Sequence, residues 1–400
     1  MSQKNGKFKI LIYGEYFLPV VGGVQTSMNL LAKGLVELNT RQEKNGDPGQ
    51  IEVTIATRTA AGGIDDSIFP YRVVRRPGFW RLGKLIRDAD VVHVAGPCLL
   101  PMTIGWLIGK PVVVEHHGYQ AICPNGLLFQ RPAETVCPGH FVRRDYGECL
   151  RCCYVTEGWA RGLRSLLVTF PRYWLSRRVA ANITITNHVA VRLKLPQTET
   201  VYYGIEVQDL TGAGGAPPPS GCLEIAYVGR LVPEKGLTVL LQAAKRLKDM
   251  GASFEVKIIG DGPDRRRLEK LAETLNLNGL AQFTGDLRDS DLDRAVSKID
   301  IVVMPSVWEE TAGLSVIEQM MRGRVVIVAD IGGLSEVVGD AGLKFATGDS
   351  QALADCIRKV IDNPTLLVSL GLEARERAIR LFSLNTMIQG HVSRYRVASR

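Results

Sequence analysis

Two glutamates, Glu310 and Glu318, stand eight positions apart in the stretch EETAGLSVIEQ. They could be an acid/base pair, unrelated charges on a solvated helix, or the two ends of a clamp on a long ligand. A helix is expected from Gly313 to about Arg322, and eight helical residues rise about 12 Å. Paired carboxylates of glycoside-cleaving sites stand only about 5 to 9.5 Å apart, so the spacing disfavours hydrolysis. It suits hydroxyls at the two ends of a nucleotide sugar, with the diphosphate at the helix start near Gly313 and Leu314.

Two cations, Arg230 and Lys235, stand in the stretch VGRLVPEKG, directly after an apolar run of strand length. Long cations at the end of a buried strand could converge on one diphosphate, although cations in a surface loop are more often solvated. Near the N-terminus, Gly22 and Gly23 separate another strand-like run from a helix-like segment. Adjacent glycines let the backbone approach a bulky anion, and the same pair could also be only a tight turn.

A cluster of cysteines marks the first half of the chain. Cys123, Cys137, Cys149 and Cys152 have the spacing C-x13-C-x11-C-x2-C, which could complete a tetrahedral structural zinc site within an insertion near residues 119–160. Free or redox-active thiols and disulfides are the alternatives. Clustering in a chain without an export signal favours metal or free thiols over disulfides.

The elements that must position these residues follow from the pattern of apolar residues. Continuous apolar runs such as FKILIYG, DVVHVAG, LEIAYVG and FEVKIIG are typical of strands buried on both faces of a parallel sheet. Helix-like segments separate these runs at the spacing of βαβ units in both halves of the chain. The sequence therefore predicts an α/β protein with two doubly wound, Rossmann-like domains facing a cleft, with ligands beyond the carboxyl ends of the strands.

Composition predicts the boundary between the two domains. The stretch TGAGGAPPPSG can bury little apolar surface and is expected to be a linker at 209–221. It separates a first domain at 1–208 from a second at 222–381. A last helix at 382–400 is expected to pack back on the first domain.

The charge of the chain bears on its partners and location. The formal net charge of +8 indicates anionic partners. No run approaches the roughly 18 to 20 apolar residues of a membrane span, and the N-terminal stretch lacks signal-peptide features, so a cytoplasmic location is expected. Residues 159–178 mix arginines with aromatic and leucine residues, as in a helix lying on an anionic membrane surface. A core helix with a solvated basic face is the alternative, and Pro171 predicts a break in the segment.

Several motifs, taken in order, resemble one known family. The stretches GGVQTSMNLLAKGL, YVGRLVPEKG, PSVWEETAGLSVIEQMMRG and GGLSEVV are similar to the retaining glycosyltransferases of the GT-B fold, in particular the group called family 4. The resemblance implies transfer of a hexose from a UDP- or GDP-linked donor, with retention of configuration and without an obligatory metal ion. It implies a glycan or lipid-linked acceptor in cell-surface polysaccharide or glycolipid synthesis, peripheral contact with the membrane, and no nucleic-acid partner.

The resemblance also implies a role for each candidate residue. Arg230 and Lys235 would neutralise the leaving diphosphate. Glu310 would hold hydroxyls of the donor sugar, and Glu318 would hold those of the ribose. His117, in EHHGY, matches a family histidine that would steady charge developing at the anomeric carbon, although a lone histidine at a strand end is more often structural. The backbone groups expected to cradle phosphate are those of Gly22, Gly23, Gly313 and Leu314.

Thr311 and Ala312 stand where the family often has Gly-Phe, which could alter the fit of the donor sugar.

Two alternative functions remain open from the sequence. An epimerase of the same fold would isomerise the nucleotide sugar without an acceptor. A basic binding protein for nucleic acid or an anionic glycan would bind polymer in a salt-sensitive way without turnover.

Overall fold

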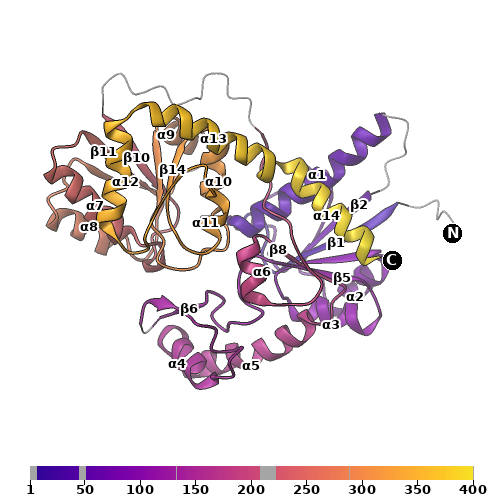
Figure 1. Cartoon of the computed structure of the whole chain (residues 1–400). Helices are drawn as coiled ribbons and strands as arrows, with labels where there is room; N and C mark the ends of the chain where they lie inside the picture. Colours follow the sequence, from indigo (N-terminus) through magenta and orange to yellow (C-terminus); the bar gives the residue numbers. More distant parts are fainter. Residues whose placement is uncertain (1–6, 45–50, 132, 208–221, 288, 400) are drawn as a thin grey trace. The chain divides into compact units, whose positions relative to one another are not determined.

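The chain forms two separate α/β units. The structure, a computed structural model, describes all residues except 1–6, 45–50, 132, 208–221, 288 and 400 (Figure 1). One unit comprises Met1–Ala133, Cys137–Glu206 and Phe382–Arg400, and the other comprises Glu134–Val136 and Val207–Leu381. The linker expected at 209–221 lies outside the described residues.

The first unit is built on a parallel sheet of seven strands in the order β3-β2-β1-β4-β5-β8-β9. Its strands are β1 (Phe8–Gly14), β2 (Ile51–Thr57), β3 (Arg72–Arg75), β4 (Val91–Ala95), β5 (Val112–His116), β8 (Ala181–Thr184) and β9 (Thr198–Thr200). Its helices are α1 (Gly23–Lys44), α2 (Phe79–Asp88), α3 (Leu99–Leu107), α4 (Tyr146–Glu157), α5 (Trp159–Ser176), α6 (Asn187–Leu193) and α14 (Leu384–Ala398), with a 3-10 turn at Asp66–Ile68. A separate two-stranded sheet pairs β6 (Phe129–Gln130) with β7 (Thr135–Val136).

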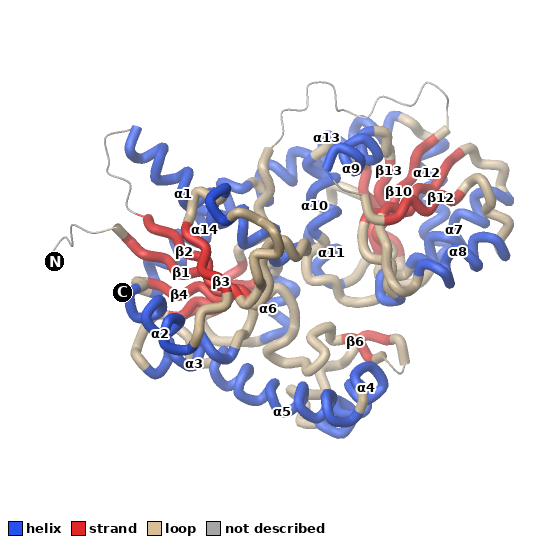
Figure 2. The backbone as a smooth tube through the Cα atoms, turned by 180° about the vertical axis from the view of Figure 1, so that it is seen from behind, coloured by secondary structure: helices blue, strands red, loops and turns tan. Residues whose placement is uncertain are grey.

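The second unit has a parallel sheet of six strands in the order β12-β11-β10-β13-β14-β15. Its strands are β10 (Leu223–Val228), β11 (Phe254–Ile259), β12 (Ala281–Gly285), β13 (Ile301–Met304), β14 (Val325–Ala329) and β15 (Leu343–Phe345). Its helices are α7 (Leu237–Asp249), α8 (Arg265–Thr274), α9 (Asp289–Ser297), α10 (Leu314–Met321), α11 (Gly332–Val338), α12 (Ser350–Asp362) and α13 (Thr365–Phe382), with a 3-10 turn at Pro233–Lys235. Figure 2 shows the strands of each unit gathered between helices.

Side-chain alternation along β1 shows why the first sheet is covered on both faces. Ile10 and Ile12 belong to one buried cluster, which includes side chains of α1 and α14. Leu11 and Tyr13 belong to a second cluster, which includes side chains of α2, α3 and α5. Because successive side chains of a strand point to opposite faces, continuous apolar runs such as β1 need a helix layer on each side. The prediction of doubly wound, parallel sheets is confirmed.

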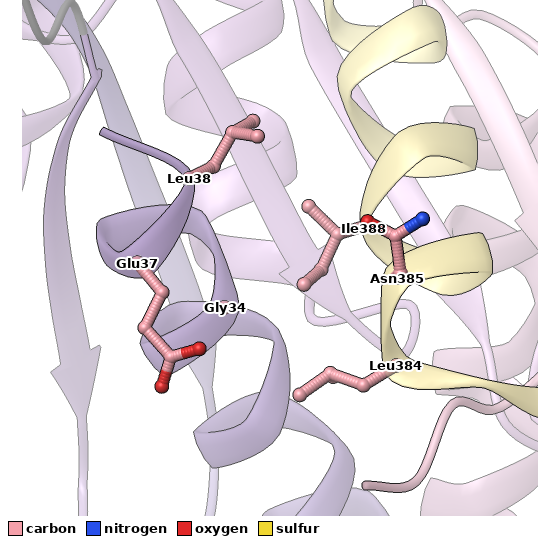
Figure 3. Close-up of a pocket in the computed structure, with 6 residues that line it drawn as sticks. All are labelled: Gly34, Glu37, Leu38, Leu384, Asn385 and Ile388. Carbon is pink, nitrogen blue, oxygen red and sulfur yellow. The ribbon is translucent and has the colours of Figure 1, made fainter. Parts of the chain in front are cut away.

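The last helix, α14, packs on α1 within the first unit. Met387, Ile388, Val392 and Tyr395 are buried in the cluster that also holds β1. The two helices approach closely at Gly34, where an added Cβ would come within 2.0 Å of Cδ1 of Ile388 (Figure 3). Residues of these two helices also line a small cavity, shown in Figure 3.

One expectation about the helices is wrong. Pro171 lies inside α5, which continues without a break from Trp159 to Ser176. Buried residues before and after the proline, including Leu166 and Leu175, pack the helix against the rest of the unit and outweigh the hydrogen bond that proline cannot make. Across the described residues, none of the helices combines the length and the apolar character needed to cross a bilayer.

Candidate functional site

The strand order places a ligand crevice at one defined point of each sheet. In the second sheet β10 pairs with β11 on one side and with β13 on the other, so the order in which strands are added to the sheet reverses between β10 and β13. Open α/β sheets bind ligands outside the carboxyl ends of the strands at such a switch point. Arg230 and Lys235 follow β10, while Glu310 follows β13, so the sheet brings these residues to the same edge.

Backbone contacts hold the loops after β10 and β13 together. Gly236 has φ +67°, and a Cβ at this position would lie 2.0 Å from the carbonyl oxygen of Pro305. Only glycine tolerates this combination of conformation and close approach. The amide of Val307 also donates a hydrogen bond of 3.0 Å to the carbonyl of Glu234.

Lys235 and Glu310 form an ion pair in this crevice. Nζ of Lys235 bonds Oε1 of Glu310, and the hydroxyl of Ser306 donates to the same oxygen at 2.8 Å. The side chains of Lys235 and Glu310 are 15% and 6% exposed, so the pair is largely removed from water. Charged hydrogen bonds are stronger in such surroundings, and the pair fixes the direction of the carboxylate. Ser306 was not anticipated from the sequence, although it stands directly after a buried strand.

The loop after β14 supports Glu310 from another side. The amide of Gly333, in the first turn of α11, donates a 2.6 Å hydrogen bond to the carbonyl oxygen of Glu310. A Cβ on Gly333 would lie 2.2 Å from the carbonyl oxygen of Thr311, so the glycine permits this contact. The connections after β10, β13 and β14, which are neighbours in the sheet, therefore define the position of Glu310.

Arg230 is the exposed cation of the crevice. It lies two residues beyond β10, and its side chain is exposed. Its carbonyl oxygen accepts a 2.8 Å hydrogen bond from the hydroxyl of Tyr227, which is fully buried. Burial raises the pKa of Tyr227 well above its usual range, so the phenol stays a donor at ordinary pH. The backbone of Arg230 is thereby fixed, and its guanidinium faces solvent.

The helix near Glu318 begins later than the spacing estimate assumed. α10 starts at Leu314, after Gly313 with φ +76°, so Glu310 stands in the preceding loop and only Glu318 is helical. The 12 Å estimate, which treated all eight positions as helix, is therefore wrong, because helical rise accounts for about 6 Å from Leu314 to Glu318. Burial raises the pKa of Glu318, and nearby Arg322 offsets part of that rise.

In the first unit, Gly22 and Gly23 lie at the end of the connection between β1 and α1. They follow β1 at its carboxyl end, and α1 begins at Gly23. The carbonyl of Gly22 accepts a 2.9 Å hydrogen bond from the amide of Thr26, which closes the first helical turn. Gly23 is exposed and Gly22 is half-buried. The connection between β1 and α1 can therefore present backbone groups to an anion.

His117 is placed differently from what a sugar-contacting residue requires. Its Nδ1 lies 2.9 Å from the hydroxyl of Tyr203, whose ring stacks on the imidazole with centroids 5.7 Å apart. Its Nε2 lies 3.3 Å from a carboxylate oxygen of Glu115, and the side chain is only 4% exposed. Both ring nitrogens thus face groups of the protein, and a sugar hydroxyl would have to displace one of them.

Glu115 is the centre of a buried polar network that the sequence did not reveal. Its oxygens lie 3.2 Å from Nε2 of His93 and 3.5 Å from Nε2 of His391, in addition to the contact with His117. Nδ1 of His391 donates to the carbonyl of Met387 at 2.9 Å. Burial by itself would raise the pKa of Glu115, but the charges and hydrogen bonds of His117 and His391 outweigh it and hold the pKa well below its usual range.

This network is also the one group of three candidate metal ligands gathered among the described residues. The ligand atoms of His93, Glu115 and His391 lie within 4.8 Å of one another. They come from β4, β5 and α14, and all three residues are fully buried. Because the carboxylate oxygens of Glu115 already face the imidazole nitrogens of the three histidines, we interpret the group as a structural network that holds α14 and His117 on the sheet.

The four cysteines of the predicted zinc site lie in the segment that follows β5 and ends with α4. All eight cysteines of the chain fall within the described residues and are free thiols, so the disulfide alternative is wrong. Cys149 and Cys152 lie on α4, and Cys123 and Cys137 lie in loops flanking β6 and β7. His140 lies among these cysteines in the sequence, and its Nδ1 is 2.9 Å from a carboxylate oxygen of Asp145.

Two doubly wound α/β units in one chain are the GT-B class of fold. Within that class, residues 217–377 match the family described as Glycosyl transferases group 1. The match covers the second unit, which carries Arg230, Lys235, Glu310 and Glu318. The sequence of the second unit and the fold of the chain therefore lead to the same class.

Similar proteins extend this comparison. A 2-deoxystreptamine glucosyltransferase from Streptomyces kanamyceticus is 32% identical over 216 residues, which cover 50% of this chain and 55% of that protein. The chain spans 55% to 60% of the length of the first curated relatives it matches. A sucrose-phosphate synthase from Thermosynechococcus elongatus has the same fold, with a TM-score of 0.71, 19% identity and 98% coverage of both chains. Anabaena HepE in complex with UDP has a TM-score of 0.69 at 16% identity, covering 97% of this chain and 98% of its own.

Proposed function

We propose that the protein is a retaining glycosyltransferase that moves a hexose from a nucleoside-diphosphate sugar to a glycan or lipid-linked acceptor. The observation that carries the proposal is the Lys235–Glu310 pair, held with exposed Arg230 at the switch point of the second sheet. A family match over the same unit supports glycosyl transfer. Relatives that transfer sugars and a structural neighbour that binds UDP support a nucleotide-sugar donor.

Departure of the nucleoside diphosphate creates the charge that this site must stabilise. As the anomeric bond breaks, negative charge grows on the phosphate. A cation already fixed in position lowers the barrier, because the site need not reorganise during the reaction. Arg230 would supply that cation directly, because its guanidinium faces solvent. Lys235 has three donors, so it would contact phosphate while remaining bonded to Glu310. The first turn of α10, at Gly313 and Leu314, would add backbone amides.

The two glutamates would hold opposite ends of the donor. Glu310 is fixed through one oxygen by Lys235 and Ser306, which leaves its second oxygen to accept hydroxyls of the sugar. Glu318 would accept the vicinal hydroxyls of the ribose. Burial raises its pKa, so a hydroxyl-rich ligand that donates to the carboxylate would favour the ionised form. We assign no side-chain nucleophile, and His117, which faces Glu115 and Tyr203, is not given direct contact with the sugar.

The acceptor side is assigned to a membrane surface. On α5, Leu163, Leu167, Phe170 and Trp174 recur at helical spacing, and all four are exposed. The guanidinium of Arg178 lies 3.9 Å above the ring of Trp174. An exposed apolar stripe flanked by arginines fits the interface of an anionic bilayer. The enzyme would then act on a lipid-linked or membrane-proximal acceptor from the cytoplasmic side.

A nucleotide-binding and turnover experiment tests the activity. UDP or GDP should raise the unfolding temperature of the purified protein in a panel of nucleoside diphosphates and nucleotide sugars, because a ligand of the folded state stabilises it. The stabilising nucleotide sugar is then incubated alone and with candidate acceptors. A transferred product with the donor's anomeric configuration is expected. Isomerised donor without acceptor would establish the epimerase, and salt-sensitive polymer binding without turnover would establish the binding protein.

A further inference from the structure

The cysteine-rich segment between β5 and α5 has little regular structure to hold it. Between Tyr119 and Gly158 the described elements are the two-residue strands β6 and β7 and the helix α4. Five of the eight cysteines of the chain fall in this segment. Cys123, Cys137, Cys149 and Cys153 are each less than a tenth exposed. Small segments that cannot bury a large apolar core commonly depend on a metal ion or disulfides, and disulfides are absent here among the described residues.

Two of these cysteines begin similar tight loops. The stretches CPNG and CPG start at Cys123 and Cys137, and each leads to a glycine with positive φ, +76° at Gly126 and +91° at Gly139. The amide of Gly139 donates to Sγ of Cys137 at 3.4 Å. Backbone amides aimed at a sulfur favour the thiolate, which is the form that binds metal.

The other two cysteines face these loops from α4. Cys149 and Cys152 are three residues apart on the helix and therefore lie on one side of it. Asn125 connects the two groups, because its Nδ2 donates to Sγ of Cys152 at 3.3 Å while its Oδ1 accepts from Sγ of Cys123 at 3.0 Å. Sγ of Cys152 also lies 3.6 Å from the carbonyl oxygen of Phe129. The loops that begin at Cys123 and Cys137, together with α4, thus direct their cysteine sulfur atoms toward the interior of the same segment.

We propose that Cys123, Cys137, Cys149 and Cys152 bind one zinc ion as four thiolates. On binding, four S–H groups lose their protons to solvent and four Zn–S bonds form, with no change in oxidation state. Tetrahedral Zn–S bonds of about 2.3 Å require sulfur atoms about 3.8 Å apart. In the described structure no three of these sulfurs lie within 4.8 Å of one another, so binding draws the loops and α4 together.

Cys153 is excluded from the ligand set by its packing. It is 1% exposed, and a Cβ added to Gly162 of α5 would lie 3.1 Å from its Cβ. Its side chain thus packs at the junction of α4 and α5. Cys153→Ser therefore provides a matched control, since it changes a buried cysteine of the same helix without changing the zinc set.

The test is metal analysis of the reduced, full-length protein purified without chelators. About one zinc per chain is expected, and replacement by Co²⁺ should give the visible absorption of a tetrahedral thiolate site. Cys123→Ser and Cys152→Ser should each lose the stoichiometric metal, whereas Cys153→Ser should keep it. If the ligand variants do not fold, thiol modification of the folded parent protein should release its zinc, with Cys153→Ser behaving alike.

Three results would overturn the proposal. The first is a folded, reduced protein that holds no zinc after incubation with zinc chloride and dialysis. The second is stoichiometric iron in place of zinc. The third is loss of zinc in Cys153→Ser with retention in Cys152→Ser. None of these measurements involves sugar transfer. A negative result would therefore reject the zinc site without bearing on the proposed glycosyltransferase activity.

Discussion

At the scale of single residues, the crevice of the second unit depends on pairs rather than on isolated groups. Lys235 and Glu310 neutralise one another, and Ser306 fixes the shared oxygen. Glu318 lies on α10, where burial raises its pKa and nearby Arg322 offsets part of that rise. The two glutamates therefore have different surroundings, and this difference leads to different expected effects of mutation.

Glu318→Gln is expected to weaken binding of the nucleoside diphosphate, and Glu310→Gln is expected to reduce turnover. Loss of a charged hydrogen bond to the ribose costs about 1.5 to 3 kcal/mol, or roughly tenfold to hundredfold in Kd. Loss of the oriented Glu310 carboxylate should lower kcat by roughly a hundredfold with a smaller change in nucleotide binding. Isothermal titration with the diphosphate and steady-state kinetics measure both. Glu273→Gln, on the exposed side of α8, is the charge-matched control.

Equal and small effects of the two variants on Kd and kcat would contradict the division of roles between the glutamates. An effect of Glu273→Gln as large as that of Glu318→Gln would show that general charge, rather than the ribose contact, governs binding.

Acid should destabilise the first unit through His116. Burial lowers the pKa of His116 to about 4, although its Nε2 lies 2.9 Å from Oδ1 of Asn182. Because the folded-state pKa lies below the ordinary value near 6.5, the folded state resists protonation. Its contribution to stability is complete above pH 6.5 and is lost as the pH falls toward 4, by about 3 kcal/mol in all. His116→Gln should flatten this dependence of the unfolding free energy, measured by denaturant titration at several pH values.

Acid also removes the stabilising ionisation states of His93 and Glu115. The unfolding free energy of both the parent protein and His116→Gln should therefore fall in acid. Burial lowers the pKa of His93, while the pKa of Glu115 is held low by its histidines, and both therefore add stability that acid removes. Only the difference between the two curves reports His116. Parallel curves between pH 6.5 and 4 would contradict the assignment.

At the scale of elements, α5 has a buried side and an exposed apolar side. Its buried side, which includes Leu166 and Leu175, joins the first unit. Its exposed apolar stripe is formed by Leu163, Leu167, Phe170 and Trp174. Cohesion of the helix across Pro171 comes from the buried side. Phe170 and Trp174 also pack on aromatic rings, those of Phe141 and Trp106, each with centroids 5.1 Å apart. Leu163 and Leu167 are therefore the stripe residues to change with the least effect on the fold.

The double variant Leu163→Ser/Leu167→Ser is expected to bind anionic vesicles at least about tenfold more weakly, because burying each leucine contributes about 1.5 to 3 kcal/mol. Co-sedimentation with vesicles of mixed anionic and neutral phospholipid measures the effect. Val191→Ser, at an exposed position of α6, is the control and should bind like the parent. Unchanged vesicle binding by the double variant, with intact folding, would rule out α5 as the membrane surface.

At the scale of the whole molecule, the chain leaves the first unit and returns to it. The first unit needs residues up to Glu206 and again from Phe382 onward, so its core is completed only by the last helix. Gly34 of α1 is a point where α14 approaches closely. Synthesis and folding of this unit therefore cannot finish before the end of the chain is available.

Gly34→Leu is expected to destabilise the first unit by about 2 kcal/mol or more, because the side chain would overlap Ile388 and force α14 outward. The thermal transition of the first unit should move down while that of the second remains, as measured by calorimetry with a stabilising nucleotide to mark the second unit. Gly83→Leu replaces a glycine of α2 with no neighbour within 4 Å of its added Cβ, and it should not destabilise. A shared downward shift in both variants would contradict the packing argument.

Sequence patterns determined the class of fold because apolar runs and helical periodicity are local properties. They also placed Arg230, Lys235 and Glu310 in loops after strands, where open α/β sheets bind ligands. They did not determine where α10 begins, since the backbone of Gly313 adopts its conformation against Leu334 of a different helix.

Only the tertiary structure decided which groups face one another. Glu310 meets Lys235 because β10 and β13 are adjacent in the sheet, and Glu115 meets His93 and His391 because β4, β5 and α14 converge. These partners are separated by tens to hundreds of positions in the chain, so no local pattern records them. Local chemistry thus predicted the elements and candidate residues, while long-range packing decided their partners and states of ionisation.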